Sequence, residues 1–554
     1  MSHHVLIAKA WPYANGSLHL GHIAGLLAAD VLARYFRLRG DKVLFVSGTD
    51  CHGTPILNRA IVEGKNPAEI VDFYHQQFTD NFLRLGFTHD LYAKTMDPEH
   101  QQLVQQFFQC LYEQQYLFPK IIPQLYCSPC QRFLVDRYVE GECPNCHANG
   151  ARGDQCDLCG KTYEAIALIN PHCKTCASSA QIKESTQLHF NLQILQPKLT
   201  AWIDQVKHNW RTNAQHTTEG WLKEGLTNRA VTRDIDWGIP VPIEGFTDKV
   251  IYVWFEAVLG YLTTSIRHCG GDLDAGPWEA WWRKENNPLH YYVHGKDNIP
   301  FHTIIFPAML LAYGNLALAT HIISSEYLQL PAGQKFSTSQ GCGTTIPDFL
   351  DLVGKVSGLE VDSLRFFLIA NHPENKDAQF SWTELANQHN TELVNKLSNL
   401  VNRIHKLTLD NFHNQVPEPV ALSTPDQAML QVLVDGYQNI GTSLEAGSMR
   451  QTSRLWLEIV EKANAYLNQQ APWKQIKTDR QQAANTLYVG WQVLCNLHSL
   501  LQPFLPFTCQ RLANILNLPP TTGSWRFTTL PAGTLLGSGL FLFTRINRAD
   551  LPAD

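Results

Sequence analysis

The N-terminal part of the chain alternates between two kinds of apolar periodicity. Residues 5–8 and 42–46 are short apolar runs, and residues 18–39 between them carry apolar side chains at helical spacing as far as Gly40. A strand, a helix and a second strand of these lengths predict the βαβ unit of a parallel sheet. Two long helical patterns follow, to about residue 116.

The alternation of strands and helices stops at residue 117, where Pro, Gly, Cys and Asn become frequent, and it resumes after residue 229. We expect this segment to be an insert that divides one sheet domain into two halves. Beyond the insert, the periodicity predicts strands at 250–254, 290–294 and 320–324, and helices at 256–268 and 299–313.

Strand patterns end at about residue 386, and helical periodicity rich in Gln, Asn and Leu continues to about residue 518, which predicts a helical bundle. Short apolar strands are expected near 540–543. The predicted fold class is α/β: a split Rossmann-type parallel sheet with an insert, followed by an all-α bundle. The expected parts are residues 1–116 and 230–325 for the two halves of the sheet domain, 117–229 for the insert, 326–385 for a connecting region and 386–554 for the bundle.

The composition is that of a globular protein with several cores. A chain of 554 residues, with 44% hydrophobic and 17% charged residues, is too long for a single core. The net charge of −6 neither indicates nor excludes a nucleic-acid partner, because a local basic face acts over short range. The sequence shows no apolar run long enough to span a bilayer and no secretory signal, so we expect no membrane partner and a cytoplasmic location.

Eight of the fourteen cysteines form four CxxC pairs within residues 127–176. One such pair occurs by chance or in redox proteins, whereas four so close together are typical of tetrahedral zinc sites. Since each site needs four thiolates, the pairs allow two structural zinc ions. The other six cysteines are scattered, as free thiols in a reducing cytoplasm are. The pairs are Cys127 and Cys130, Cys143 and Cys146, Cys156 and Cys159, and Cys173 and Cys176.

The turn after the first strand has the sequence WPYANGSLHLGH over residues 11–22, and it places His19 and His22 at the start of a helix. Residues three apart project from the same side of the first helical turn. That turn offers unpaired backbone N–H groups and the positive end of the helix dipole, which suit a polyphosphate. Asn15 and Gly16 supply the tight turn through which the backbone approaches such a ligand.

This turn resembles the HIGH signature of class I aminoacyl-tRNA synthetases, in the form used by the methionyl enzymes. KFSTS at residues 335–339 is similar to the KMSKS loop of that family. The insert and the helical tail also lie where the family has them, so the resemblance covers nearly the whole chain. It implies that ATP, with Mg²⁺ on its triphosphate, and L-methionine are substrates, and that tRNA(Met) receives the methionyl group.

By this resemblance, His19 and His22 bind the phosphates and stabilise the in-line transition state, and Lys335 holds the leaving pyrophosphate. Asp297, in a Gly-Lys-Asp segment after a strand, lies near the ATP ribose. Thr338 stands where the family has a second lysine, so one positive charge of the loop is missing. The implied ATP-binding residues are Asn15, Gly21, Asp297, Lys335, Ser337, Thr338 and Ser339.

For methionine, the resemblance implies a pocket with aromatic and small apolar walls and a carboxylate, Asp50, that faces the ammonium group. Two positions depart from the family pattern, because Trp11 stands where Leu is common and Val258 where Pro is common. Both departures change the shape of the pocket. The implied methionine-binding residues are Trp11, Tyr13, Asp50, Trp254, Ala257, Tyr261 and His302.

The resemblance also divides the cysteines between the two zinc sites and gives the insert a role in positioning the acceptor end of the tRNA. The common single site of the family has the spacing of Cys143, Cys146, Cys156 and Cys159. The outer pairs would close a second site, as in members with two zinc ions: Cys127, Cys130, Cys173 and Cys176.

Three residues of the helical tail match the family's readers of the CAU anticodon. Asn399 and Arg403 lie four apart and share one helical face, and Trp473 lies with Pro472 at the end of another helix. An amide and a guanidinium suit the edges of unstacked bases, and an exposed indole gives a base a surface on which to stack.

Two other functions stay open at this point. A leucine, isoleucine or valine enzyme of the same class carries an editing insert much larger than residues 117–229. A degenerate synthetase paralogue that binds tRNA or regulates another process is compatible with Thr338. Members that dimerise usually do so through a C-terminal appendage, which these 554 residues do not contain, so we expect a monomer.

Overall fold

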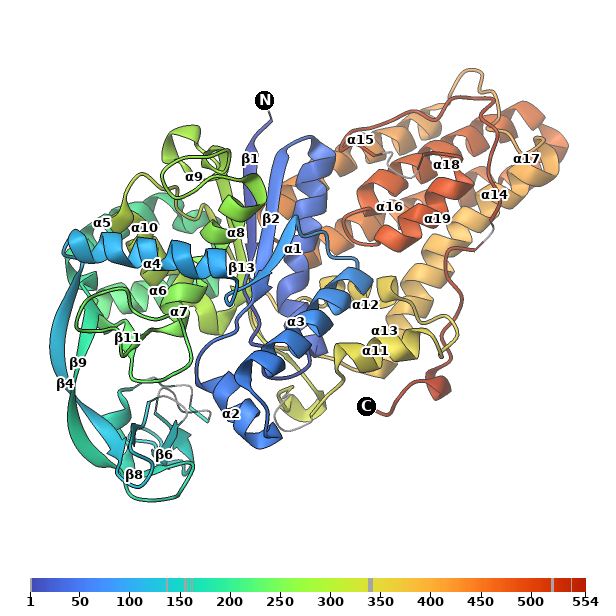
Figure 1. Cartoon of the computed structure of the whole chain (residues 1–554). Coiled ribbons are helices and arrows are strands. Elements are labelled where there is room, and N and C mark those ends of the chain that lie inside the picture. Colours follow the sequence, from blue (N-terminus) through green and yellow to red (C-terminus); the bar gives the residue numbers. More distant parts are fainter. Residues whose placement is uncertain are drawn as a thin grey trace.

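A five-stranded parallel sheet with the order β14-β13-β1-β2-β3 lies at the centre of the molecule (Figure 1). Strand β1 pairs with β2 on one side and with β13 on the other, so the strand order reverses at β1. In open parallel sheets, ligands bind beyond the carboxyl ends of the strands at such a reversal. The strands are β1 His4–Lys9, β2 Lys42–Thr49, β3 Leu91–Lys94, β13 Leu289–Gly295 and β14 His321–Ser325. The computed structural model describes residues 2–135, 138–153, 156, 158–159, 161, 163–336, 342–519, 523–539 and 541–554.

Alternate residues of β1 enter two different hydrophobic cores. Val5 and Ile7 pack in the core that contains α1 and α3. Leu6 and Ala8 pack in the core that contains α4, α8 and α10. Because both faces are covered, residues 5–8 of the strand are all apolar instead of alternating. The covering helices are α1 Leu20–Arg39, α2 Thr54–Glu63 and α3 Pro67–Arg84 on one face, and α4 Pro98–Glu113, α8 Gly260–Cys269 and α10 Phe306–Tyr313 on the other.

The insert is a long antiparallel hairpin that carries the cysteines away from the sheet (Figure 1). Its arms are β4 and β9, and a small β7-β6-β8 sheet lies at its tip. The inserted elements are β4 Leu117–Cys127, β5 Arg132–Phe133, β6 Val139–Glu142, β7 Ala151–Arg152, β8 Ile169–Cys173, β9 Gln181–Phe190, α5 Leu192–Val206, α6 Thr212–Glu224 and β10 Arg229–Ala230. The expected insert between the two halves of a parallel sheet is thus confirmed.

The helical bundle lies on the side of the sheet opposite to the insert (Figure 1). A connecting region leads to it, through β15 Leu328–Gln329, α11 Ile346–Val353, α12 Val361–Ala370 and β16 Ala378–Gln379. No described helix is both long and apolar enough to cross a membrane. The helices of the bundle are α13 Trp382–Gln388, a π-helical segment His389–Ser398, α14 Asn399–Asn411, α15 Thr424–Glu445, α16 Met449–Gln470, α17 Pro472–Thr478, α18 Arg480–Leu501 and α19 Pro506–Ile515.

The structure corrects the prediction of a strand at residues 250–254. Only β12 (Val250–Ile251) is extended, and it pairs antiparallel with β11 (Thr232–Arg233) outside the main sheet. The helix α7 already begins at Val253 and continues to Ala257. Short apolar runs fit a strand and a buried helical turn equally well, which is why the periodicity did not separate them.

Three other predictions also differ from the structure. Strand β3 lies within the region predicted to be helical, where its four residues form the edge of the sheet. The helix predicted at 299–313 begins with a π-helical turn at Phe301–Ile305 and continues as α10. Of the strand expected near 540–543, residues 541–543 are described and are not extended in a sheet. The Ser398 hydroxyl accepts from the backbone N–H groups of Leu542 and Phe543 instead.

Candidate functional site

The turn between β1 and α1 is closed by two histidines that cap each other. His19 is the N-cap residue, and its Nδ1 accepts the backbone N–H of His22 at 3.3 Å. In return, Nδ1 of His22 accepts the backbone N–H of His19 at 3.2 Å. The two rings stack with their centroids 3.7 Å apart. This arrangement is a capping box made by imidazoles, and it fixes both rings at the start of the helix.

The capping bonds also fix where the two imidazoles carry their protons. Burial lowers the pKa of His19 to about 4. Burial, with the nearby charges of His19 and Lys9, lowers the pKa of His22 well below its usual value. Both rings are therefore neutral at pH 7, and since each Nδ1 accepts a hydrogen bond, each Nε2 carries the proton. The turn presents two neutral N–H donors beside the positive end of a helix dipole.

Of the 335–339 segment, Lys335 and Phe336 are described, and Phe336 lies against this turn. The Phe336 ring stacks on His19 with the centroids 5.3 Å apart. After the segment, Thr344 and Ile346 pair with the backbone of the turn, through Leu20 N to Thr344 O at 3.2 Å and Ile346 N to Leu18 O at 2.7 Å. Ser337, Thr338 and Ser339 lie outside the described residues. Phe336 before the undescribed residues, and Thr344 and Ile346 after them, thus all contact the His19 turn.

Tyr327 connects Lys335 to the end of β13. The exposed Lys335 ammonium lies 4.9 Å from the centre of the Tyr327 ring, and the Lys296 ammonium lies 4.1 Å from it. The Tyr327 hydroxyl donates to the Asp297 carboxylate at 2.5 Å. Lys296 also binds the carboxylates of Glu326 at 2.6 Å and Asp377 at 3.0 Å. The structure thus brings Asp297 and Lys335 into one polar cluster at the carboxyl end of the sheet.

Asp50 lies directly beyond β2, next to the turn that follows β1. Its backbone N–H donates to Pro12 O at 2.9 Å, and its carbonyl accepts from Ala14 N at 3.0 Å. The side chain is buried. Burial and the nearby Glu256 charge raise the pKa of Asp50 well above its usual value. A positively charged ligand stabilises the ionised form of such a buried carboxyl group, so binding of a cation is favoured there.

Glu256, which the sequence analysis missed, forms a buried network behind Asp50. Its two carboxylate oxygens contact His52 Nδ1 at 2.8 Å and His100 Nε2 at 3.0 Å. Burial alone would raise the pKa of Glu256, but these two histidines outweigh it and hold the pKa below its usual value. The only sequence signal was His52, which lies two residues after Asp50. It does not indicate a network unless its distant partner Glu256 is known.

The residues predicted to form the methionine pocket lie around Asp50. Tyr13 accepts a hydrogen bond from the Trp254 indole N–H. Tyr261 is buried and its hydroxyl contacts His302 Nε2 at 2.8 Å. Nearby Asp50 also contributes, after burial, to the raised pKa of Tyr261. Ala257 is buried on the same helix as Trp254.

Two glycines explain how a Trp fits where Leu is common in related proteins. A Cβ on Gly48 would lie 2.5 Å from the Trp11 ring, and a Cβ on Gly260 would lie 2.6 Å from it. The indole therefore occupies the space that two side chains would otherwise fill. Val258 is buried in the hydrophobic core that includes α8.

The eight paired cysteines form two groups with the division that the family spacing implied. In one group, Cys143 and Cys159 Sγ lie 3.9 Å apart, and Cys146 and Cys156 Sγ 3.6 Å apart. The other group joins Cys127, Cys130, Cys173 and Cys176, with Cys127 and Cys176 Sγ at 3.4 Å. Four sulfurs around a zinc ion with Zn–S bonds of about 2.3 Å lie roughly 3.8 Å apart, so both groups fit such an ion.

Asn399, Arg403 and Trp473 lie together in the bundle, far along the chain from the sheet. The Arg403 guanidinium stacks over the Trp473 ring at 5.0 Å, and it donates to Asn468 Oδ1 at 2.8 Å. Trp473 is 36% exposed, and Asn399 is exposed on the first turn of α14. Trp473 begins α17 rather than ending a helix. The face offers an amide, a guanidinium and an indole to a ligand.

Comparisons with known proteins find matches over nearly the whole chain. The family described as tRNA synthetases class I (M) matches residues 5–405, and the anticodon binding domain of methionyl tRNA ligase matches residues 416–552. Methionine–tRNA ligase 1 of Alkaliphilus oremlandii is 42% identical over 98% of this chain and 97% of its own length. Methionine–tRNA ligase 2 of Bacillus cereus is 42% identical over 93% of this chain and 92% of its own length.

A solved structure shows the same fold. Mycobacterium tuberculosis methionyl-tRNA synthetase, in complex with methionyl-adenylate, matches 98% of this chain and all of its own with a TM-score of 0.80 and 23% sequence identity. The fold class predicted from the sequence is confirmed, and so is the resemblance to class I synthetases. The chain belongs to the methionyl family of class I tRNA synthetases, the methionine–tRNA ligases.

Proposed function

We propose that this chain joins L-methionine to tRNA(Met) in two steps, as a methionine–tRNA ligase in protein synthesis. ATP and methionine form methionyl-adenylate and pyrophosphate, and the methionyl group then passes to a ribose hydroxyl of the terminal adenosine of the tRNA. The observation that carries the proposal is the meeting of the His19–His22 turn, the Lys335 segment and buried Asp50 at one end of the sheet. Family membership supports it.

In the first step, the methionine carboxylate attacks the α-phosphorus of ATP. The Nε2–H groups of His19 and His22 donate to phosphate oxygens on which charge develops, and Lys335 holds the leaving pyrophosphate. Asp50 binds the methionine ammonium, and the side chain enters between the aromatic walls. Asn15, Gly21 and Asp297 hold the rest of the ATP, together with the hydroxyl groups of residues 337–339, and Mg²⁺ accompanies the triphosphate.

The two cysteine groups are assigned to structural zinc. Four thiolates with no other ligand close the tetrahedral shell, so neither site leaves a position for a reacting group. Their place at the tip of the β4–β9 hairpin supports a role in holding the acceptor end of the tRNA (Figure 1). We expect the protein to be a cytoplasmic monomer, and none of the described cysteines forms a disulfide, as is usual in a reducing compartment.

Metal analysis of the purified chain is expected to give about two zinc ions per chain. Cys156→Ser and Cys173→Ser each remove one buried thiolate from a different group, so each variant retains one ion. Cys269→Ser, which changes a cysteine of neither group, retains both. One zinc ion in the unaltered chain would contradict the assignment of one group.

Trp473→Ala is expected to lower kcat/KM for tRNA charging by roughly 5- to 150-fold, because it removes a stacking surface worth about 1 to 3 kcal/mol per base. Pyrophosphate exchange, which needs no tRNA, stays unchanged. Phe73→Ala removes an aromatic ring that is 62% exposed on α3, outside the anticodon face, and serves as the matched control. Equal effects of the two substitutions on charging would contradict the role of Trp473.

The function is tested by charging a tRNA(Met) transcript with labelled methionine, leucine, isoleucine or valine. Methionine alone is expected on the tRNA, and changing the CAU anticodon is expected to abolish most of the charging. The comparisons give no support to a tRNA-binding paralogue without activity. Tight binding of the transcript without any charging would nevertheless favour that paralogue.

A further inference from the structure

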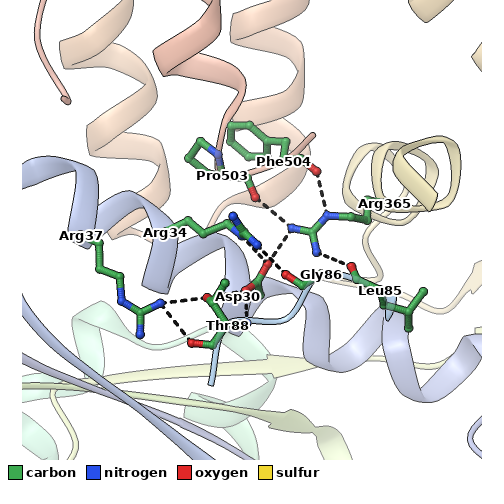
Figure 2. A network of polar contacts seen from close by, with 9 residues as sticks. All are labelled: Asp30, Arg34, Arg37, Leu85, Gly86, Thr88, Arg365, Pro503 and Phe504. Atoms are coloured by element: carbon green, nitrogen blue, oxygen red, sulfur yellow. Dashed lines mark hydrogen bonds and ion pairs between the residues drawn. The ribbon is translucent and has the colours of Figure 1, made fainter. Parts of the chain in front are cut away.

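Arg365 on α12 is buried where four separate segments of the chain meet (Figure 2). Its Nη2 contacts the Asp30 carboxylate of α1 at 2.7 Å. The same guanidinium donates to three backbone carbonyls: Leu85 O at 3.0 Å, Pro503 O at 3.1 Å and Phe504 O at 3.0 Å. Leu85 directly follows α3, and the other two lie between α18 and α19 in the bundle. One side chain thus bonds both the sheet domain and the bundle.

Asp30 also makes several hydrogen bonds besides the one with Arg365. It accepts from Arg34 Nε at 2.9 Å and from the backbone N–H and hydroxyl of Thr88 at 2.9 and 2.8 Å. Arg34 in turn donates to Gly86 O at 2.6 Å (Figure 2). Burial alone would raise the pKa of Asp30, but Arg34 and Arg365 outweigh it and lower the pKa to about 2. The carboxylate is therefore charged at neutral pH.

A buried ion pair of this kind is a weak source of stability, since desolvation offsets much of its attraction, and its best-attested use is to fix register. A planar guanidinium with five donors can satisfy Asp30 and three carbonyls only in one relative placement of the segments. An apolar contact would tolerate sliding between the bundle and α1. The bonds of Arg365 select one docking position.

Arg365 binds Asp30 of α1, the same helix whose N-terminus is capped by His19. Asp30 lies ten residues after Leu20, about 15 Å along α1. The C-terminal part of α1 contacts the bundle again, where Tyr35 and Arg39 bind the Glu445 carboxylate of α15 at 2.6 and 2.5 Å. The helix α1 is thus a rigid connection between the catalytic turn and the bundle that carries the anticodon face.

We propose that Arg365 is a positioning residue for tRNA charging. It holds the bundle with Asn399, Arg403 and Trp473 in one orientation relative to α1, so that a tRNA bound at the anticodon face places its acceptor end at the His19 turn. This inference rests on the function proposed above. It predicts that substitution of Arg365 lowers only the rate of the tRNA-dependent step, and only when the tRNA makes its anticodon contact.

The test compares the full-length unaltered chain with Arg365→Lys, which keeps the charge but loses the fork of donors. Methionine-dependent pyrophosphate exchange is expected to stay within about twofold, while kcat/KM for charging tRNA(Met) falls by roughly 5- to 150-fold. With a tRNA whose anticodon is changed, the substitution is expected to have no further effect, because the contact that it positions is already lost. Arg283→Lys alters an ion pair with Glu279 on the short helix α9 (Glu279–Trp282), within the sheet domain, and is the matched control expected to change neither activity.

A second variant covers the case in which Arg365→Lys does not fold. Asp30→Leu combined with Arg365→Met removes the fully buried ion pair, which a folded protein often tolerates. Arg34 loses its carboxylate partner, but it is partly exposed and keeps its bond to Gly86 O. This variant is expected to show the same split between exchange and charging. The proposal would be overturned if a variant lost pyrophosphate exchange as strongly as tRNA charging. It would also be overturned if the variant lowered charging of the tRNA with the altered anticodon as much as charging of tRNA(Met). Either result would leave Arg365 a structural residue. If the unaltered chain charges no tRNA at all, the proposed function has failed instead.

Discussion

His19→Asn is expected to lower the rate of methionine-dependent pyrophosphate exchange by about 100- to 1,000-fold. The substitution removes the Nε2–H that we assign to the phosphates in the transition state. It keeps the helix cap, because Asn is among the best N-cap residues. Asn66 caps α3 in this protein in the same way, accepting the backbone N–H of Ala68 at 2.9 Å. Pyrophosphate exchange at saturating methionine and ATP measures the loss.

The control for this variant is its thermal unfolding midpoint, which should stay close to that of the unaltered chain because the cap is retained. His75→Asn changes a histidine on α3, on another helix of the same domain, and should leave the exchange rate unaltered. An exchange rate within threefold of the unaltered rate in His19→Asn would mean that the imidazole does not act on the phosphates.

Asp50→Asn is expected to raise the KM for methionine by roughly 30- to 700-fold. The reason is that truncating one partner of a buried charge pair costs about 2 to 4 kcal/mol, and each 1.4 kcal/mol is tenfold. The substitution keeps the size and the backbone bonds of the residue but removes the charge that faces the ammonium. KM for ATP should change little. A change in the KM for ATP as large as that for methionine would show that Asp50 serves the whole site and not the ammonium.

The raised pKa of Asp50 also sets the direction of a pH effect. Below that pKa, free Asp50 is protonated and does not attract the ammonium, so the KM for methionine should fall as pH rises through it. Methionine binding releases the proton. In Asp50→Asn this dependence disappears, and in Glu256→Gln it moves to lower pH, because Glu256 is the charge that adds to burial in raising the pKa. A pH profile unaltered in Asp50→Asn would rule this explanation out.

The local features of the site were predictable because they are encoded in neighbouring residues. The β1–α1–β2 unit and the place of His19 and His22 at the start of α1 depend on apolar spacing and on one turn, so they were predictable. The cap that each histidine provides for the other was seen only in the structure. The contacts of Phe336 and Thr344 with that turn join residues more than three hundred positions apart, which periodicity does not encode. The resemblance to the family supplied this pairing.

The network behind Asp50 shows a different limit of sequence reasoning. Glu256 is the first residue of the helix predicted at 256–268, and its partners His52 and His100 come from two other segments. Nothing in their spacing indicates that they meet. The two glycines around Trp11 became visible only once the indole was placed between β2 and α8. Such sites depend on packing between elements, which the folded chain alone defines.

Methionine-dependent exchange of labelled pyrophosphate into ATP is the most direct test of whether this chain activates methionine. Leucine, isoleucine and valine serve as controls. Exchange with methionine alone is expected, and it would also show that Thr338 is tolerated in the Lys335 loop. A folded, zinc-loaded chain that binds tRNA but exchanges pyrophosphate with none of the four amino acids would contradict it.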